Sequence, residues 1–373
     1  MRVVVAMDSF KGSLTAPEAC RAVREGLLQA GAGWNVSVFP LADGGEGTAR
    51  SLQEALNGQW CVARVRGPLG LRQVDAGYAW IPARGEAVVE MAAASGLTLL
   101  SEKERDPLRT STYGTGQLMQ EAALQGAGRI LLGIGGSATN DGGTGAARAL
   151  GWRFLDSDGA ELPDGGGSLP RLNRIEPPAA HSLPAVEVLC DVTNSLLGPN
   201  GASAVFGPQK GAGPAEVRQL EEGLRRLDGV VRDQFGIEMN ALPGGGAAGG
   251  LGAGAVAFMN ATLVSGIDTV MDCLELPDAV RSADWVLTGE GRFDSQSLQG
   301  KVATGVTRLA GEGRAQVGVL AGIVHLDETA WKEAGIADVE PAAPGGVPVE
   351  EAMAGAFELL KAAARRLGER MRK

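Results

Sequence analysis

Histidine is scarce in this sequence, and the cysteines are not paired. The two histidines, His181 and His325, lie far apart, and neither an HExxH nor a CxxC motif is present. A serine–histidine triad and the usual zinc sites are therefore disfavoured. The four cysteines are scattered, which is typical of reduced thiols in the cytoplasm and not of a disulfide framework. We expect a cytoplasmic protein.

Basic residues are outnumbered, and long uninterrupted apolar runs are missing. Lysine and arginine total 34 against 44 acidic residues, a net charge of -10, which disfavours binding to nucleic acid. The N-terminal apolar run is too short for a signal peptide. The uncharged stretch 239–267 contains Pro243 and eight glycines, so it reads as a glycine-rich loop before a buried helix and not as a membrane span. We predict neither a nucleic-acid nor a membrane partner, and the oligomeric state stays open.

Glycine, by contrast, is abundant. The 373 residues include 57 glycines, about twice the usual share of roughly 7%. They cluster instead of recurring every third residue, which excludes a collagen-like protein. The segment GIGGSATNDGG, residues 133–143, directly follows the apolar run RILL. Because glycine lets the backbone turn sharply or approach a ligand closely, such clusters predict functional loops.

Strand and helix patterns alternate at both ends of the chain. An apolar run at 2–9, a capped amphipathic pattern at 15–31 and a second run at 35–43 predict strand, helix and strand, the signature of a parallel sheet. The same alternation spans 283–324. A final amphipathic helix is expected from Glu350 onward. Its inward residues should be Met353, Phe357, Leu360, Ala364 and Leu367.

The middle of the chain has a different pattern, with an irregular stretch near 156–184 and the long glycine-rich run. We therefore predict an α/β protein with two domains. Residues 1–62 and 283–373 should form one parallel α/β domain, and residues 63–282 a second α/β domain inserted into it. A cleft between the two is expected.

Each predicted strand is followed by an acid, small hydroxyl residues and glycine, often with a cation nearby. Ligands bind beyond the carboxyl ends of parallel strands, so these loops are the candidate site. The residues expected to bind nucleotide or substrate are Asp8, Ser9, Gly44, Gly45, Gly135, Gly136, Ser137, Thr139, Asn140, Asp141, Thr193, Asn194, Lys210, Ser295 and Lys301.

This set of residues suits phosphoryl transfer. Glycine amides cradle phosphate, cations neutralise it, and carboxylates hold Mg²⁺ and accept the proton of an alcohol. We assign Lys11 and Arg292 to phosphate or carboxylate, Glu290 and Asp294 to the metal, and Asp191 to the catalytic base. For each acid the structural alternative is that it only caps a helix.

Two other functions fit parts of the sequence. Gly133, Gly135 and Ala138 match the G-x-G-x-x-A dinucleotide fingerprint, which would indicate a nicotinamide-dependent hydroxy-acid oxidoreductase. That fingerprint should open a helix directly, and TNDGG interrupts it. A nucleotide-binding module without catalysis is the other alternative. The Walker pattern is absent, because Val302 follows Gly300 and Lys301.

Several longer motifs together resemble one family, the bacterial glycerate kinases of type 1. They are DSFKGSLTAPE, PLADGGEGT, STYGTGQL, GIGGSATNDGGTGAARALG, CDVTNSLLGPNGASAVFGPQKGA, GGGAAGGLGAG and LTGEGRFDSQSLQGKVATGV. The resemblance covers most of the chain. Ser195 stands where proline is expected and Phe293 where an aliphatic residue is usual, and neither position carries the predicted chemistry.

This resemblance implies ATP- and Mg²⁺-dependent phosphorylation of D-glycerate, with 2-phospho-D-glycerate favoured over the 3-isomer as the product. It also implies that the domain made from the two chain ends is flavodoxin-like. The substrate follows from the resemblance alone, whereas phosphoryl transfer also follows from the residues of the loops.

Overall fold

The structure is a computed structural model that describes all residues except 32, 43, 71, 181–182, 296, 299–301, 344–346 and 373. The chain forms two compact units. Unit 1 comprises Met1–Asp43, Glu54–Leu56 and Ile267–Lys373, and unit 2 comprises Gly44–Gln53 and Asn57–Gly266. The domain boundaries expected near residues 62 and 282 stay a prediction.

Unit 1 is built on a five-stranded parallel sheet with the order β13-β12-β11-β1-β2. In the chain order of this unit that is 2-1-3-4-5, the flavodoxin-like order. The predicted α/β class is thereby confirmed. The strands are β1 (Arg2–Met7), β2 (Asn35–Val38), β11 (Trp285–Phe293), β12 (Gln316–Val324) and β13 (Asp338–Pro341).

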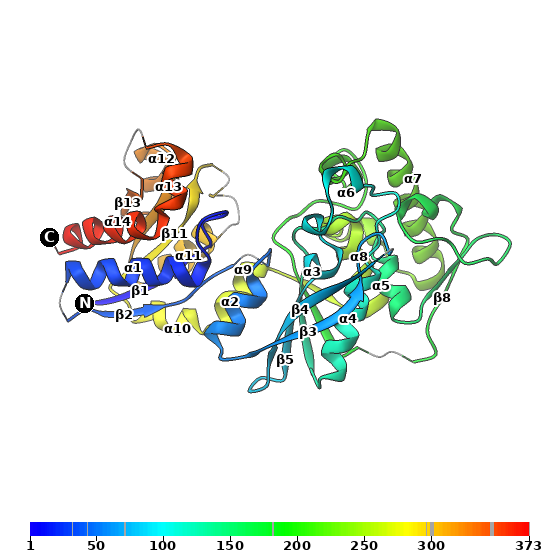
Figure 1. Ribbon diagram of the computed structural model, residues 1–373, viewed down its shortest axis with the longest axis horizontal. Helices are drawn as coiled ribbons and strands as arrows, with labels where there is room; N and C mark the ends of the chain where they lie inside the picture. The colour runs from blue at the N-terminus through cyan, green and yellow to red at the C-terminus, as the bar shows by residue number, and fades with distance from the viewer. Residues whose placement is uncertain are drawn as a thin grey trace. The chain divides into compact units, whose positions relative to one another are not determined.

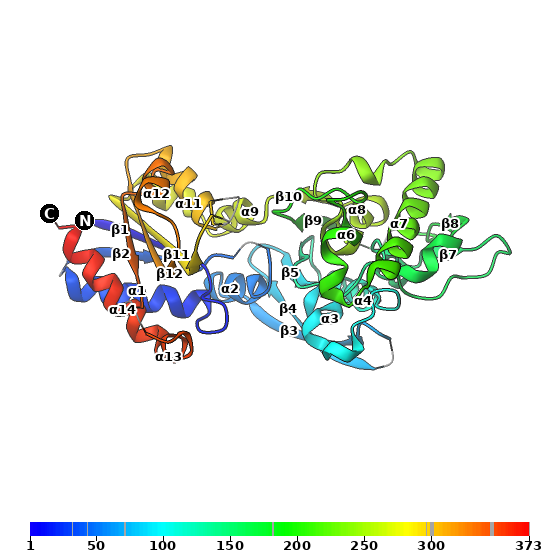
Figure 2. The same ribbon diagram turned by 90° about the horizontal axis from the view of Figure 1, so that it is seen from above.

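Helices cover both faces of this sheet. The helices α1 (Ala16–Ala30) and α14 (Ala356–Arg370) lie side by side on one face, and α11 (Val302–Gly311) lies on the other (Figure 2). Thr15 and Glu18 form the expected capping box at the start of α1. Gly26 lets α14 approach closely, because a Cβ there would lie 2.2 Å from the carbonyl oxygen of Lys361.

The expected final helix is in fact two helices. They are α13 (Val349–Ala354) and α14, separated at Gly355. Leu360, Ala364 and Leu367 are buried as predicted, whereas Met353 is 39% exposed. Its predicted inward position was wrong. Met353 belongs to α13, and the break at Gly355 separates it from the buried stripe of α14.

Unit 2 contains a six-stranded mixed sheet with the order β10-β9-β6-β5-β4-β3. The strands β5, β6, β9 and β10 run parallel, and β3, β4 and β5 form an antiparallel meander. Their bounds are β3 (Gln59–Arg66), β4 (Gln73–Ile81), β5 (Glu86–Glu90), β6 (Arg129–Gly133), β9 (Ala185–Leu189) and β10 (Thr262–Val264). A separate hairpin pairs β7 (Arg153–Leu155) with β8 (Arg174–Glu176).

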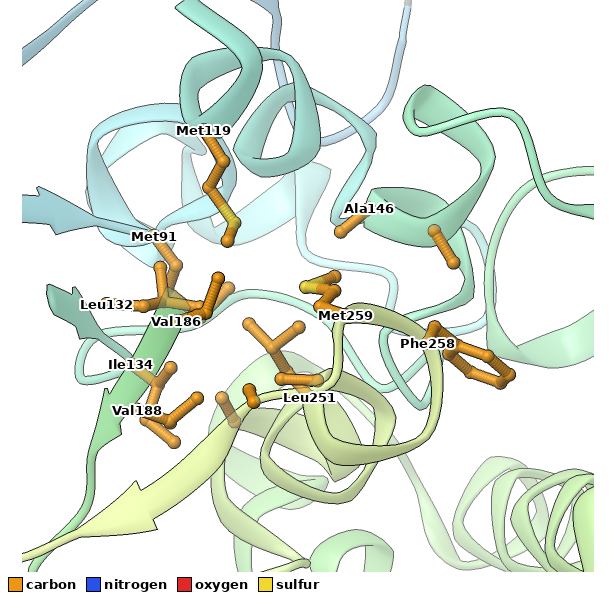
Figure 3. Close-up of a cluster of buried hydrophobic side chains, with 14 of the residues drawn as sticks. Met91, Met119, Leu132, Ile134, Ala146, Val186, Val188, Leu251, Phe258 and Met259 are labelled. Carbon is orange, nitrogen blue, oxygen red and sulfur yellow. The ribbon is translucent and has the colours of Figure 1, made fainter. Parts of the chain in front are cut away.

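The core of unit 2 lies between the sheet and its helices. Figure 3 shows Met91, Leu132 and Val186 pointing toward Met119 of α4 and Met259 of α8. Around them pack the helices α4 (Tyr113–Leu124), α5 (Thr144–Ala149), α7 (Pro214–Phe235) and α8 (Ala247–Met259). The shorter helices of the chain, some visible in Figure 1, are α2 (Thr48–Ala55), α3 (Ala92–Ser95), α6 (Ala202–Phe206), α9 (Gly266–Cys273), α10 (Leu276–Arg281) and α12 (Glu328–Glu333).

The glycine-rich run before and within α8 serves close backbone packing. Gly249 has a φ of +68°, and a Cβ there would lie 2.1 Å from the carbonyl oxygen of Thr139. A Cβ on Gly254, inside the helix, would lie 2.1 Å from that of Gly142. The run therefore lets α8 press against the loop 133–143. Among the helices that the structure describes, none combines the length and hydrophobicity needed to cross a bilayer.

We expect Gly254→Ala to destabilise the protein by roughly 1–3 kcal/mol, as overpacking does, because the new methyl group has no space. Gly229→Ala is a matched control: this glycine also lies inside a helix, α7, but nothing stands within 4 Å of its Cβ position. It should stabilise the protein by about 0.5–1 kcal/mol through helix propensity. Urea denaturation measures both, and equal effects of the same sign would contradict the packing argument.

Candidate active site

The candidate site of unit 1 is a pocket at the carboxyl ends of its parallel strands. The pocket has a volume of about 430 Å³ and is lined by the loop after β1, the end of β11, the ends of β12 and β13, and α13 with the start of α14. It lies where connections from the neighbouring strands β1 and β11 lead to opposite sides of the sheet, the position at which open α/β sheets bind ligands.

A tight turn presents the first cation of this pocket. Phe10 and Leu14 exchange two backbone hydrogen bonds of 2.8 and 3.0 Å, and Gly12 has a φ of +81°. Lys11 lies at the exposed tip of the turn. The turn also abuts β11, since a Cβ on Gly291 would lie 3.6 Å from the backbone nitrogen of Lys11. Two motifs far apart in sequence therefore meet here.

Charged residues of both signs line the pocket. Most of the unit 1 residues predicted from the sequence are brought together there: Asp8, Ser9, Lys11, Glu290, Arg292 and Asp294. Ser295 is exposed and is not among the lining residues. Lys301 lies outside the described residues, so the structure does not place it.

Carboxylates suited to a magnesium ion are present in the same pocket. Among the described residues no three or more of His, Cys, Asp and Glu are grouped to hold a metal by themselves. Mg²⁺, however, is commonly bound by one or two carboxylates together with water and substrate phosphates. Asp8, Glu290 and Asp294 line one pocket, so the donor set fits an ion completed by phosphate.

Unit 2 has its own polar edge, at the carboxyl ends of β5, β6 and β9. The loop 133–143 follows β6, and Gly44 and Gly45 pack against it and against β9. A Cβ on Gly135 would lie 2.9 Å from the Cα of Gly45, and one on Gly44 would lie 2.7 Å from the Cβ of Leu189. These predicted phosphate-binding glycines thus serve at least one packing role. Gly136 has a φ of +71° and turns the chain.

Lys210 is the buried cation of unit 2. Its side chain is 1% exposed, and its Nζ donates to Ser137 Oγ at 2.7 Å and to the carbonyl oxygen of Thr139 at 2.6 Å. No carboxylate of the described residues lies within ion-pair distance. Desolvation by burial therefore lowers the pKa of Lys210 to about 7, and the charge of Asp141 opposes this shift.

Asp141 holds the loop 133–143 to the start of α5. It is fully buried and accepts hydrogen bonds from Thr112 N at 2.8 Å, Thr112 Oγ1 at 2.9 Å, Gly143 N at 3.0 Å and Gly145 N at 3.1 Å. Desolvation raises the pKa of Asp141, and these donors oppose the rise. The contacts give Asp141 a structural role, and its predicted contact with a ligand stays a prediction.

Two neighbours of Asp141 have polar atoms without a partner among the described residues. They are Thr139 Oγ1 and Asn140 Oδ1, and both side chains are fully buried. The amide nitrogen of Asn140 donates to Ser203 Oγ at 3.1 Å. A buried polar atom without a partner is costly, so both side chains remain candidates for contact with a small polar ligand.

The loop after β9 carries the predicted base. Asp191 Oδ1 accepts from the backbone nitrogen of Gly266, the first residue of α9, at 2.9 Å and from Ser265 Oγ at 3.1 Å. Asn194 Nδ2 donates to the carbonyl oxygen of Asn200 at 2.8 Å, and Thr193 is exposed. Asp191 therefore has a structural partner at a helix start as well as its predicted role.

Sequence reasoning missed Glu90 and Thr112. Glu90 ends β5 at the same edge of the sheet and accepts from the backbone nitrogen of Ala49 at 2.7 Å, and desolvation raises its pKa. An acid directly after the apolar run AVV, residues 87–89, was the same signal that selected the other loops. The bonds of Thr112 to Asp141 could not be found this way, because they join distant segments.

The dinucleotide fingerprint lacks its structural context. The helix after β6 begins at Thr144, well beyond Ala138. The glycines of a dinucleotide fingerprint belong to the turn that opens the helix, so the match at Gly133, Gly135 and Ala138 does not have the required geometry.

We expect the stability of the wild type to rise with pH between about 7 and 10, relative to Lys210→Met. In that window Lys210 loses its proton in the folded state but keeps it when unfolded. The difference should grow by up to about 1.4 kcal/mol per pH unit, the value for one proton. Urea denaturation at several pH values measures it. Removing the exposed Lys103 in Lys103→Met should leave the profile unchanged, and parallel profiles for the wild type and Lys210→Met would contradict the prediction.

Comparisons with known proteins agree in pointing to one family. Residues 3–372 match the glycerate kinase family. The chain is 43% identical to a glycerate kinase of Halalkalibacterium halodurans, covering 98% of this chain and 97% of the relative. It is 41% identical to the glycerate 2-kinase of Escherichia coli K12, covering 98% and 97%. A crystal structure assigned as glycerate kinase 2 of Salmonella typhimurium LT2 matches with a TM-score of 0.89 at 40% identity, covering 100% of this chain and 98% of that one.

Proposed function

Because this chain belongs to the glycerate kinase family, we propose that it phosphorylates D-glycerate and releases 2-phospho-D-glycerate. Family membership makes the protein a kinase and implies ATP as the donor. In the proposed reaction the C2 hydroxyl oxygen attacks the terminal phosphorus of ATP, and the bond from that phosphorus to the bridging oxygen breaks. ADP leaves, and the hydroxyl proton passes to a carboxylate.

One observation supports phosphoryl transfer most directly. Lys11 and Arg292 line the same pocket as Asp8, Glu290 and Asp294, at the carboxyl ends of a parallel sheet. Phosphoryl transfer is catalysed mainly by positioning and by neutralising charge on the phosphates. A pocket that combines cations with carboxylates provides both, because the carboxylates can hold a metal ion.

Magnesium is the ion that we propose for this pocket. Glu290 and Asp294 would hold it, and it would neutralise charge on the transferred phosphoryl group when bound. Three carboxylates and two cations leave the pocket lining with an excess of negative charge. Polyphosphate adds more negative charge, so its binding there requires a divalent cation in addition to Lys11 and Arg292.

Asp191 is the proposed base. A carboxylate within hydrogen-bond reach can accept the hydroxyl proton as the phosphoryl group transfers. Its contacts to Ser265 and Gly266 hold the carboxyl group at a strand end, which would keep it oriented. Thr193 and Asn194 follow it in the chain and are proposed to orient the small polar acceptor, and Thr139, Asn140 and Lys210 stay candidates for the same task.

All four cysteines are free thiols in the structure. Free thiols suit the reducing cytoplasm, where we propose that the enzyme acts.

The function is tested by assaying purified protein with ATP, Mg²⁺ and a panel of small hydroxy acids, with the product isomer identified by NMR. We expect ADP release that depends on D-glycerate, and phosphate on C2. A phosphate on C3 would overturn the product assignment alone. No turnover of D-glycerate alongside turnover of another acid would overturn the substrate.

We expect Asp191→Asn to lower kcat about 10²–10⁴-fold, the usual effect of losing a general base. Asparagine keeps an oxygen that can accept from Gly266 and Ser265, so the melting temperature should hardly change. Asp156→Asn is the matched control, because Asp156 Oδ1 also accepts two hydrogen bonds, in this case from the backbone nitrogens of Asp158 and Ala160, in a turn with no predicted role.

The magnesium dependence of this variant separates the two roles open to Asp191. Activity that stays low at raised Mg²⁺ supports a base, whereas rescue by Mg²⁺ would move Asp191 to the metal. Near-normal kcat in Asp191→Asn would remove it from the chemistry and leave the helix contact as its role.

A further inference from the structure

The pocket of unit 1 has two chemically different walls. One wall is charged and comes from the loop after β1 and the end of β11, with Lys11 and Arg292 as its cations. The other is apolar and comes from β12, α13 and α14, with Ile323, Met353 and Leu359 among its residues. A ligand that fills this pocket must therefore have a charged part and an apolar part.

D-glycerate does not have this character. It is small and carries a hydroxyl or carboxylate group at every carbon, so an apolar wall would desolvate it without replacing its hydrogen bonds. An adenine nucleotide does have it. The faces of the base are apolar, and the phosphates require cations. The volume of about 430 Å³ lies within the usual range for sites of small ligands and cofactors.

The apolar wall is partly uncovered in the structure. Val349 is 57% exposed and Met353 is 39% exposed, and both are on the short helix α13. Met353 is held over the turn that carries Lys11, since a Cβ on Gly12 would lie 2.8 Å from its Cε. The flat ring of a base could cover these exposed apolar side chains beside the cations. Burying their apolar surface would make the free energy of binding more favourable.

We propose that this pocket of unit 1 binds the adenine nucleotide, with the base against Val349 and Met353 and the phosphates toward Lys11 and Arg292. The inference rests on the proposed function for the identity of the donor and goes beyond it in placing the adenine base on the apolar wall. Specificity for the base then lies in α13, and affinity for phosphate lies in the loops after β1 and in β11.

The test is a binding measurement on the full chain without any acceptor, by titration calorimetry with MgADP and, separately, with magnesium tripolyphosphate. Met353→Gln and Val349→Gln change exposed residues, so folding should be preserved. We expect each to weaken MgADP binding about tenfold, roughly one hydrophobic contact converted to affinity, and to leave tripolyphosphate binding unchanged. Arg292→Gln should weaken both ligands.

Leu124→Gln is the matched control. Leu124 is 81% exposed at the end of α4 in unit 2, so it tests removal of an exposed apolar side chain elsewhere, and both ligands should bind this variant as they bind the wild type. Unchanged MgADP affinity in Met353→Gln and Val349→Gln would overturn the nucleotide assignment but would not contradict the proposed kinase function. If these variants instead raised only the KM for D-glycerate, the pocket would belong to the acceptor. A wild type that binds no MgADP and consumes no ATP with D-glycerate would overturn the proposed function as well.

Discussion

The pairing of β1 with β11 is the contact on which unit 1 depends. Val3 pairs with Trp285 and Met7 with Gly289, so the pairing closes a loop that contains all of unit 2. Loop closure entropy grows only slowly with length, so such an insertion is tolerated. The register also sets the chemistry. Because Met7 pairs with Gly289, the residues that follow them, Asp8 and Glu290, come at the same level of the sheet. The register also brings the Lys11 turn against Gly291. A shift by one residue would turn the charged side chains to the opposite face of β11.

Unit 2 stabilises its polar loop in another way, by burying it. Asp141 accepts hydrogen bonds from the backbone nitrogens of Gly145, in the first turn of α5, and of Thr112. Lys210, which lies outside the loop, donates hydrogen bonds to Ser137 and Thr139. These groups lose their hydration, and the network is favourable only because most of its atoms have partners. The glycines of α8 permit this arrangement, since a side chain at Gly249 or Gly254 would separate the helix from the loop. A loop that looked flexible in sequence is thus held rigidly.

The alternating patterns made the parallel sheet of unit 1 predictable, because β1, β11 and β12 contain buried apolar runs and an amphipathic, capped helix follows β1. The loops after the strands were predictable for the same reason, since parallel strands end at one edge. The break at Gly355 was not, because Met353 and Leu360 fit one helical stripe by spacing alone. Nor were the contacts of Asp141 with Thr112, which are decided by tertiary packing. Glu90 was accessible to the same reasoning, but its strand had not been recognised.

The structure also distinguishes a buried cation from exposed ones, a difference that the sequence does not show. Burial disfavours the charge of Lys210 and lowers its pKa to about 7, which weakens it as a cation for phosphate at neutral pH. Lys11 is exposed at the tip of its turn, and Arg292 is an exposed guanidinium near the end of β11. The cations of the unit 1 pocket therefore suit a polyphosphate better than Lys210 does. Lys210 is better suited to holding a loop in place, where a neutral amine still donates hydrogen bonds, and its charge can return if an anion approaches.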